Sequence, residues 1–160
     1  MSEVLHGQLE KYAKEVSGKV SVLRKGETLV EVDQAHVKQF ISNIVSDLRM
    51  RQLSTITGLD LGPNLGIMYH FWRDRDTVHV RTTVPKTQPN AVSIVEIVPG
   101  AILYEMEIHD MFGVNFDGNP WMDRKLLLPE TWPADLAPPL LKTSKPAEIR
   151  KRLHLEVEQK

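Results

Sequence analysis

The sequence predicts one α+β domain, a mainly antiparallel sheet with helices on one face, followed by an extended, proline-rich C-terminal tail. Three observations predict it: helix-spaced apolar residues near the N-terminus, short alternating strands in the middle, and a change of composition near residue 118. We therefore expect an α+β domain at 1–118 and a tail at 119–160. With 160 residues, the chain can bury about 69% of its unfolded surface, which is enough for a hydrophobic core.

The N-terminal third is expected to combine two helices with a hairpin. Apolar residues recur at helical spacing over 3–16, which predicts an amphipathic helix. Two short strands flank a Gly-containing turn at 25–27 and are expected to pair. Asp33 is well suited to cap a second helix, which should run to about Leu48.

Three strands and a third helix should follow. The strands alternate apolar and polar residues and predict an antiparallel meander, in a register that pairs His70 with His79 on the side away from the core. The third helix is expected to be interrupted at Pro99-Gly100, because proline breaks a helix. The expected ranges are 51–61, 65–73 and 77–84 for the strands and 91–113 for the helix.

The last part of the chain has a different composition. Six of the 10 prolines lie there, together with two tryptophans and the run Leu126–Leu128. This is too apolar for a disordered linker and too rich in proline for a helix or a central strand. We expect the tail to lie extended along a surface, and the alternation at 153–157 favours a short terminal strand.

The absence of cysteine narrows the chemistry that this chain can perform. It excludes disulfides, thiolate nucleophiles, zinc fingers and iron–sulfur ligation by this chain.

The 20 basic and 21 acidic side chains nearly cancel, so we expect no nucleic-acid partner. The glycines form neither a G-x-G-x-x-G nor a P-loop pattern. No apolar stretch reaches the roughly 20 residues that cross a bilayer, and the N-terminus lacks a secretory layout, so we expect a cytoplasmic protein.

The densest group of reactive side chains lies in the third helix. Glu105, Glu107, His109 and Asp110 would suit a metal or acid–base site if they converged, but a helical wheel spreads them over several directions. They cannot converge on one ion and at best form two separate pairs, Glu105 with His109 and Glu107 with Asp110.

The same helix is apolar on two sides, so it is expected to pack against two different surfaces. One is its own sheet. The other is either more of this chain or a second protein, and we favour a second protein because the segment is strongly acidic. Between residues 87 and 123 there are six acidic residues and no lysine or arginine, whereas 141–160 is mainly basic.

The stretch 101–129 resembles the signature of the thirty-kilodalton subunit of respiratory complex I. That family includes related subunits of membrane-bound nickel–iron hydrogenases and of archaeal deazaflavin-dependent dehydrogenases. Met106 and Asn119 stand where the pattern has Arg and His, and one additional residue precedes Arg124. The matching positions are Glu105, Glu107, Asp110, Met111, Phe112, Gly113, Phe116, Gly118, Pro120, Arg124 and Leu126.

The resemblance implies a structural subunit of the peripheral arm of a membrane-bound, ion-translocating oxidoreductase, with no active site and no cofactor of its own. It would dock on the hydrogenase-like large subunit and on iron–sulfur subunits, which would carry the iron–sulfur clusters and any nickel–iron centre or flavin. The chain would lie on the cytoplasmic face and meet the membrane only through the complex. The interface residues that it implies are Glu105, Glu107, Asp110, Phe112, Gly113, Phe116, Pro120 and Arg124.

Two other functions remain open from the sequence. One is a small stand-alone metal-dependent hydrolase that uses Glu105, His109 and the pair His70 and His79. The other is a generic adaptor domain unrelated to respiration.

Overall fold

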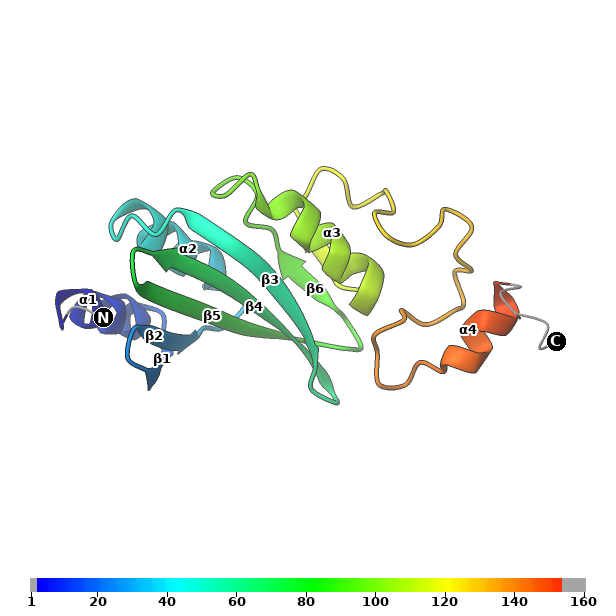
Figure 1. Ribbon diagram of the computed structural model, residues 1–160, viewed down its shortest axis with the longest axis horizontal. Helices are drawn as coiled ribbons and strands as arrows, with labels where there is room; N and C mark the ends of the chain where they lie inside the picture. Colours follow the sequence, from blue (N-terminus) through cyan, green and yellow to red (C-terminus); the bar gives the residue numbers. More distant parts are fainter. Residues whose placement is uncertain (1–2, 154–160) are drawn as a thin grey trace.

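The computed structural model describes residues 3–153, which contain four helices and seven strands (Figure 1). The chain runs from α1 at one end of the long axis to α4 at the other. The helices are α1 (Glu3–Glu15), α2 (Val37–Ser46), α3 (Ala101–Phe112) and α4 (Pro146–Arg152). The strands are β1 (Lys19–Arg24), β2 (Glu27–Glu31), β3 (Gln52–Asp60), β4 (Asn64–Arg73), β5 (Asp76–Pro85), β6 (Asn90–Val92) and β7 (Asn115–Asp117).

The main sheet has the strand order β1-β2-β5-β4-β3. Three of its neighbouring pairs are antiparallel, and β2 pairs with β5 in parallel. The register places His70 opposite His79, as the alternation of apolar residues predicts. The fold is therefore the predicted α+β fold with a mainly antiparallel sheet.

The hydrophobic core lies on one face of this sheet. Tyr69 and Phe71 of β4 and Val78 and Val80 of β5 are fully buried there. Apolar residues of α1, α2 and α3 belong to the same buried cluster, so these three helices cover one face, as predicted. The residues between them on β4 and β5 point to the opposite face, where His70 and His79 are only partly buried.

Two predicted helix boundaries are wrong. α2 begins at Val37 with His36 as its cap, and Asp33 instead accepts the N–H of Ala35 at 2.9 Å in the preceding turn. The segment 90–98 forms strand β6 and turns rather than a helix, because β6 pairs in parallel with β7 and Ile94 donates its N–H to a side chain of α3. Only the part after Gly100 is helical.

The described part of the tail, 119–153, contains one helix and otherwise runs as turns and extended chain (Figure 1). That helix, α4, differs from the predicted extended tail. It is compatible with the proline content because Pro146 occupies the first turn, where proline's missing N–H costs no hydrogen bond. Leu153 caps α4, and the rest of the predicted terminal strand lies outside the described residues.

Candidate docking site on α3 and the tail

Helix α3 lies close against β3 because Gly58 leaves room for it. A Cβ atom at Gly58 would lie 2.5 Å from the ring of Phe112, so a larger residue would force this ring to shift. The Tyr104 hydroxyl donates to the Ser54 carbonyl at 3.0 Å. The helix ends at Gly113, whose φ of 79° suits the left-handed cap that glycine adopts without strain.

Glu105 is fully buried and is surrounded by neutral donors. Its carboxylate accepts hydrogen bonds from the Ser93 hydroxyl (2.8 Å), the Ile94 N–H (2.9 Å) and the Asn119 amide (2.9 Å). Burial raises the pKa of Glu105 above its ordinary value, against the opposing effect of these three hydrogen bonds. The predicted pair with His109 is wrong, because the His109 ring bonds to the Val114 carbonyl at 2.9 Å.

Asn119 connects Glu105 to the start of the tail. Its Nδ2 also donates to the Ile102 carbonyl at 3.1 Å, and its Oδ1 accepts the N–H of Trp121 at 3.0 Å. In the sequence, Asn119 stands out only as a departure from the family pattern. The family pattern nevertheless indicates a polar contact here, because it places a polar side chain at this position and the same motif contains Glu105.

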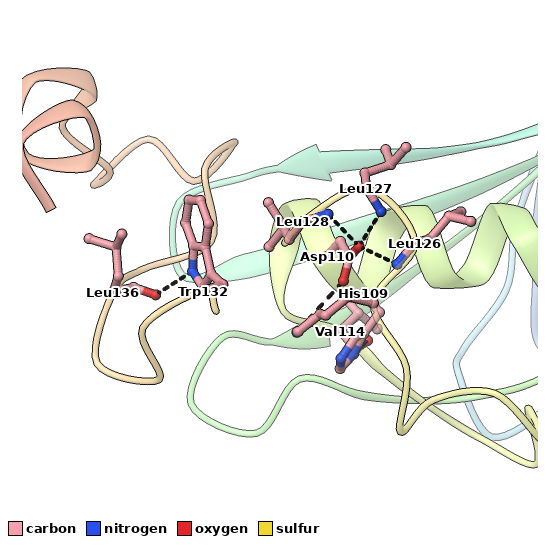
Figure 2. A network of polar contacts seen from close by, with 9 residues as sticks. His109, Asp110, Val114, Leu126, Leu127, Leu128, Trp132 and Leu136 are labelled. Carbon is pink, nitrogen blue, oxygen red and sulfur yellow. Dashed lines mark hydrogen bonds and ion pairs between the residues drawn. The ribbon is translucent and has the colours of Figure 1, made fainter. Parts of the chain in front are cut away.

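Asp110 holds the tail against α3 (Figure 2). Its Oδ2 accepts the three successive backbone N–H groups of 126–128, at 2.9, 2.7 and 3.1 Å. The Lys125 ammonium lies 3.6 Å from Oδ1. Burial opposes ionisation, but these donors and the Lys125 charge outweigh it and hold the pKa of Asp110 below its usual range. The predicted pair with Glu107 is wrong, because the Asp110 carboxylate binds the N–H groups of 126–128 and pairs with Lys125 instead.

The three hydrogen bonds from 126–128 to Asp110, which we call the clamp, determine which side chains of this segment face solvent. Because their backbones face Asp110, Leu126 and Leu127 project outward and are 38% and 56% exposed. Of the nine large exposed apolar side chains among the described residues, five lie on α3 or the tail. We call these five the exposed apolar set: Leu103, Trp121, Leu126, Leu127 and Leu140.

The tail has two further attachments to the domain. The Leu140 N–H donates to the Met111 carbonyl at 3.0 Å. The Lys142 N–H donates to Asp60 at 2.8 Å, and the Lys86 ammonium lies 2.6 Å from the same carboxylate. The hydrogen bonds from Lys86, Lys142 and Gly62 hold the pKa of Asp60 well below its usual range.

The structure separates the residues implied as interface into three groups by exposure. Glu105, Asp110 and Phe116 are buried, and both buried carboxylates are bonded within this chain. Phe112 and Gly113 are partly buried, whereas Glu107, Pro120 and Arg124 are exposed. The Arg124 guanidinium lies 5.8 Å from the ring centre of Trp121. The role of these residues in an interface stays a prediction.

The residues of the hydrolase alternative do not converge. Glu105 lies on the core side of the sheet, whereas His70 and His79 lie on the opposite face with their Nδ1 atoms 2.7 Å apart. Burial lowers the pKa of both histidines. Within 3–153, no three His, Asp or Glu side chains form a group that could hold a metal ion.

The fold and the site together define a class of protein, an α+β domain whose buried carboxylates fix its own proline-rich tail. Within the described residues, no helix has the length and apolar character needed to span a bilayer. The family described as "Respiratory-chain NADH dehydrogenase, 30 Kd subunit" matches residues 30–149, which cover most of the sheet, α2, α3 and most of the tail. The chain belongs to this family.

Known relatives agree with that assignment. An NADH-quinone oxidoreductase subunit of Saccharopolyspora erythraea is 30% identical over 116 residues, which cover 68% of this chain and 46% of that protein. The chain spans about half the length of the curated relatives it matches, with shares of 46%, 52% and 60% in three of them.

Two solved structures share the fold. A chain of the membrane-bound sulfane sulfur reductase, an archaeal respiratory membrane complex, has a TM-score of 0.82 and 19% identity, covering 99% of this chain and 96% of that one. The trypsin-resistant fragment of Nqo5 has a TM-score of 0.63 and 22% identity, covering 72% of this chain and 97% of the fragment. The first similarity includes the tail, whereas the second leaves more than a quarter of this chain unmatched.

Proposed function

We propose that this chain is a structural subunit of a membrane-bound, ion-translocating oxidoreductase related to complex I, and that it docks on the hydrogenase-like large subunit through α3 and the tail. The redox cofactors, iron–sulfur clusters with a nickel–iron centre or flavin, would reside in partner subunits, as suits a chain without cysteine. The complex would hold the chain at the cytoplasmic face of the membrane, without direct contact with lipid.

The observation that carries this proposal is the clamp at Asp110. A buried carboxylate that binds three consecutive N–H groups holds an otherwise irregular segment in one shape. That shape directs Leu126 and Leu127 into solvent, where their apolar side chains contribute no burial energy unless another surface covers them. The sulfane sulfur reductase chain, which shares the fold, is part of a respiratory membrane complex, and this supports a partner subunit as the covering surface.

Co-purification tests the proposal directly. The tagged chain is extracted from its native membranes in mild detergent, and the proteins that accompany it are identified. We expect a hydrogenase-like large subunit and iron–sulfur subunits. Partners without iron–sulfur clusters would support the adaptor alternative instead, and a tightly held stoichiometric metal ion in the purified chain would support the hydrolase.

A matched pair of leucine variants tests the surface itself. Leu127→Gln alters the exposed apolar set, whereas Leu23→Gln alters a leucine of nearly equal exposure on β1, 55% against 56%. Both variants should fold alike, because more than half of each side chain is exposed to water in the isolated chain. Only Leu127→Gln should reduce the recovery of partner subunits; equal recovery with both would contradict docking through the tail. Glu107→Gln, at an exposed carboxylate on α3, tests the helix side of the same surface.

A further inference from the structure

A cavity of about 290 Å³ lies between the C-terminal end of α3 and the tail. Asp110 and Lys125 line its polar side, and Leu128, Trp132 and Leu136 line its apolar side. Figure 2 shows Asp110 on α3 and Trp132 on the tail. The cavity is therefore formed by the clamp itself and exists only while the tail is attached to α3.

The carboxylate of Asp110 has one oxygen without a hydrogen bond. Oδ2 takes all three N–H groups of 126–128, while Oδ1 is buried and receives no hydrogen bond from any described residue. The Lys125 ammonium is 3.6 Å from Oδ1, beyond hydrogen-bond distance, and its side chain is one-third exposed. Buried carboxylate oxygens normally have a donor, so this one is suited to accept a donor from outside the chain.

None of the other described side chains that line the cavity donates to Oδ1. His109 also lines it, and its Nδ1 lies 2.9 Å from the Val114 carbonyl instead. Leu128 and Leu136 are apolar, and the Trp132 indole N–H is directed to the Leu136 carbonyl at 3.3 Å. The partly buried Trp132 ring also lines the cavity. An aromatic ring and a carboxylate oxygen that accepts no hydrogen bond line the same cavity, which favours a cation because both attract positive charge.

We propose that this cavity receives an arginine side chain of the neighbouring subunit, which donates to Asp110 Oδ1 and lies over the ring of Trp132. The proposal rests on the proposed function, because it needs a docked partner. A guanidinium fits better than an ammonium, since it is planar, weakly hydrated and able to donate in its plane while a face contacts an aromatic ring. Lys125, being partly exposed, swings into solvent when the arginine enters.

The absence of cysteine makes the cavity easy to probe in the assembled complex. Ala134→Cys, at an exposed position on the cavity wall, introduces the chain's single thiol, to which a short photo-crosslinker is attached. We expect crosslinks to a peptide of the large subunit or of an iron–sulfur subunit that contains arginine. Crosslinks to a peptide without arginine, to a second copy of this chain, or only within this chain would overturn the proposal.

A double-mutant cycle then tests the contact energetically. Trp132→Leu and Arg→Gln at the crosslinked position of the partner are each expected to weaken the affinity of the two subunits by about tenfold. The double variant should be little weaker than the partner's Arg→Gln variant alone, because that variant already removes the contact with Trp132. Trp72→Leu, at a tryptophan with 42% exposure on another part of the surface, provides the control and should combine additively with the partner variant. Additive effects for Trp132→Leu would refute the contact.

The two proposals fail in different ways. If the wild-type chain recovers no partner subunit, the proposed function is wrong. If partners are recovered but the cycle is additive, docking stands and only the arginine contact is wrong.

Discussion

Replacing Asp110 with asparagine tests whether one carboxylate holds the tail. The amide oxygen can still accept the N–H groups of 126–128, but it carries no charge. Hydrogen bonds to a charged acceptor contribute about 1.5–3 kcal/mol each, and neutral ones about 0.5–1.5 kcal/mol. Three weakened bonds therefore cost about 3 kcal/mol, and since the donors are only partly buried, water recovers some of this. We expect Asp110→Asn to weaken tail attachment by about 2 kcal/mol.

Hydrogen exchange measures this loss at the amides themselves. A loss of about 2 kcal/mol corresponds to roughly 30-fold more frequent opening, so the amides of 126–128 should exchange roughly 30-fold faster in Asp110→Asn. Amides in the buried centre of the sheet, such as that of Tyr69, should change far less, because the tail can detach while the sheet stays folded. Asp117→Asn, at an exposed carboxylate on β7, is the control and should leave exchange at 126–128 unchanged.

The same carboxylate predicts a pH dependence. The pKa of Asp110 is lower in the folded chain than in the unfolded chain. The stability that the ionised carboxylate contributes is therefore fully present above the unfolded value of about 3.9. It is lost as the pH falls through the folded value. Exchange at 126–128, corrected for intrinsic rates, should rise on acidification in the wild type and much less in Asp110→Asn. Unaltered exchange at 126–128 in Asp110→Asn at neutral pH would refute the clamp.

Three further predictions concern the fit of α3. Burial raises the folded-state pKa of Glu105 above its unfolded value of about 4.3, so its ionisation destabilises the fold as the pH rises from there. Glu105→Gln should remove this decrease in the free energy of unfolding, measured by urea titrations from about pH 4 to 8. An unchanged decrease would assign it to other groups. Gly58→Ala should cost about 1–3 kcal/mol through contact with Phe112, and Phe112→Leu should restore part of it; additive losses would exclude that contact. Gly113→Ala should cost about 1–2 kcal/mol, measured as a lower Tm, because φ is 79° there; an unchanged Tm would contradict the strain.

The strands were predictable because their information is local. Alternation of apolar residues along β4 and β5 predicts both the buried face and the register that sets His70 against His79. The parallel pairing of β2 with β5 was not predictable in this way, because nothing in either strand indicates which distant strand lies beside it.

The site was only half predictable for a related reason. A helical wheel shows where Glu105 and Asp110 point, but not what lies there. Their partners come from segments 93–94, 119 and 126–128, which have no periodicity that a wheel or an alternation pattern detects. The family pattern marked both carboxylates as special, although their observed contacts are within the chain. The high proline content of the tail likewise argued against a helix there, but Pro146 begins α4 instead of breaking it.

The tail is attached at separate points, at Asp110 for 126–128 and at Met111 and Asp60 for 140–142. The intervening stretch 129–139 spans between fixed ends, and in a flexible loop each doubling of length costs only about 0.6 kcal/mol. We therefore expect relatives to lengthen or shorten this stretch at its exposed positions, away from Trp132 and Leu136, without disturbing either attachment. Engineered insertions, such as a short epitope placed near Ala137, an exposed residue, should be accommodated for the same reason. Length variation within the family should concentrate between the two attachments and be rare inside them.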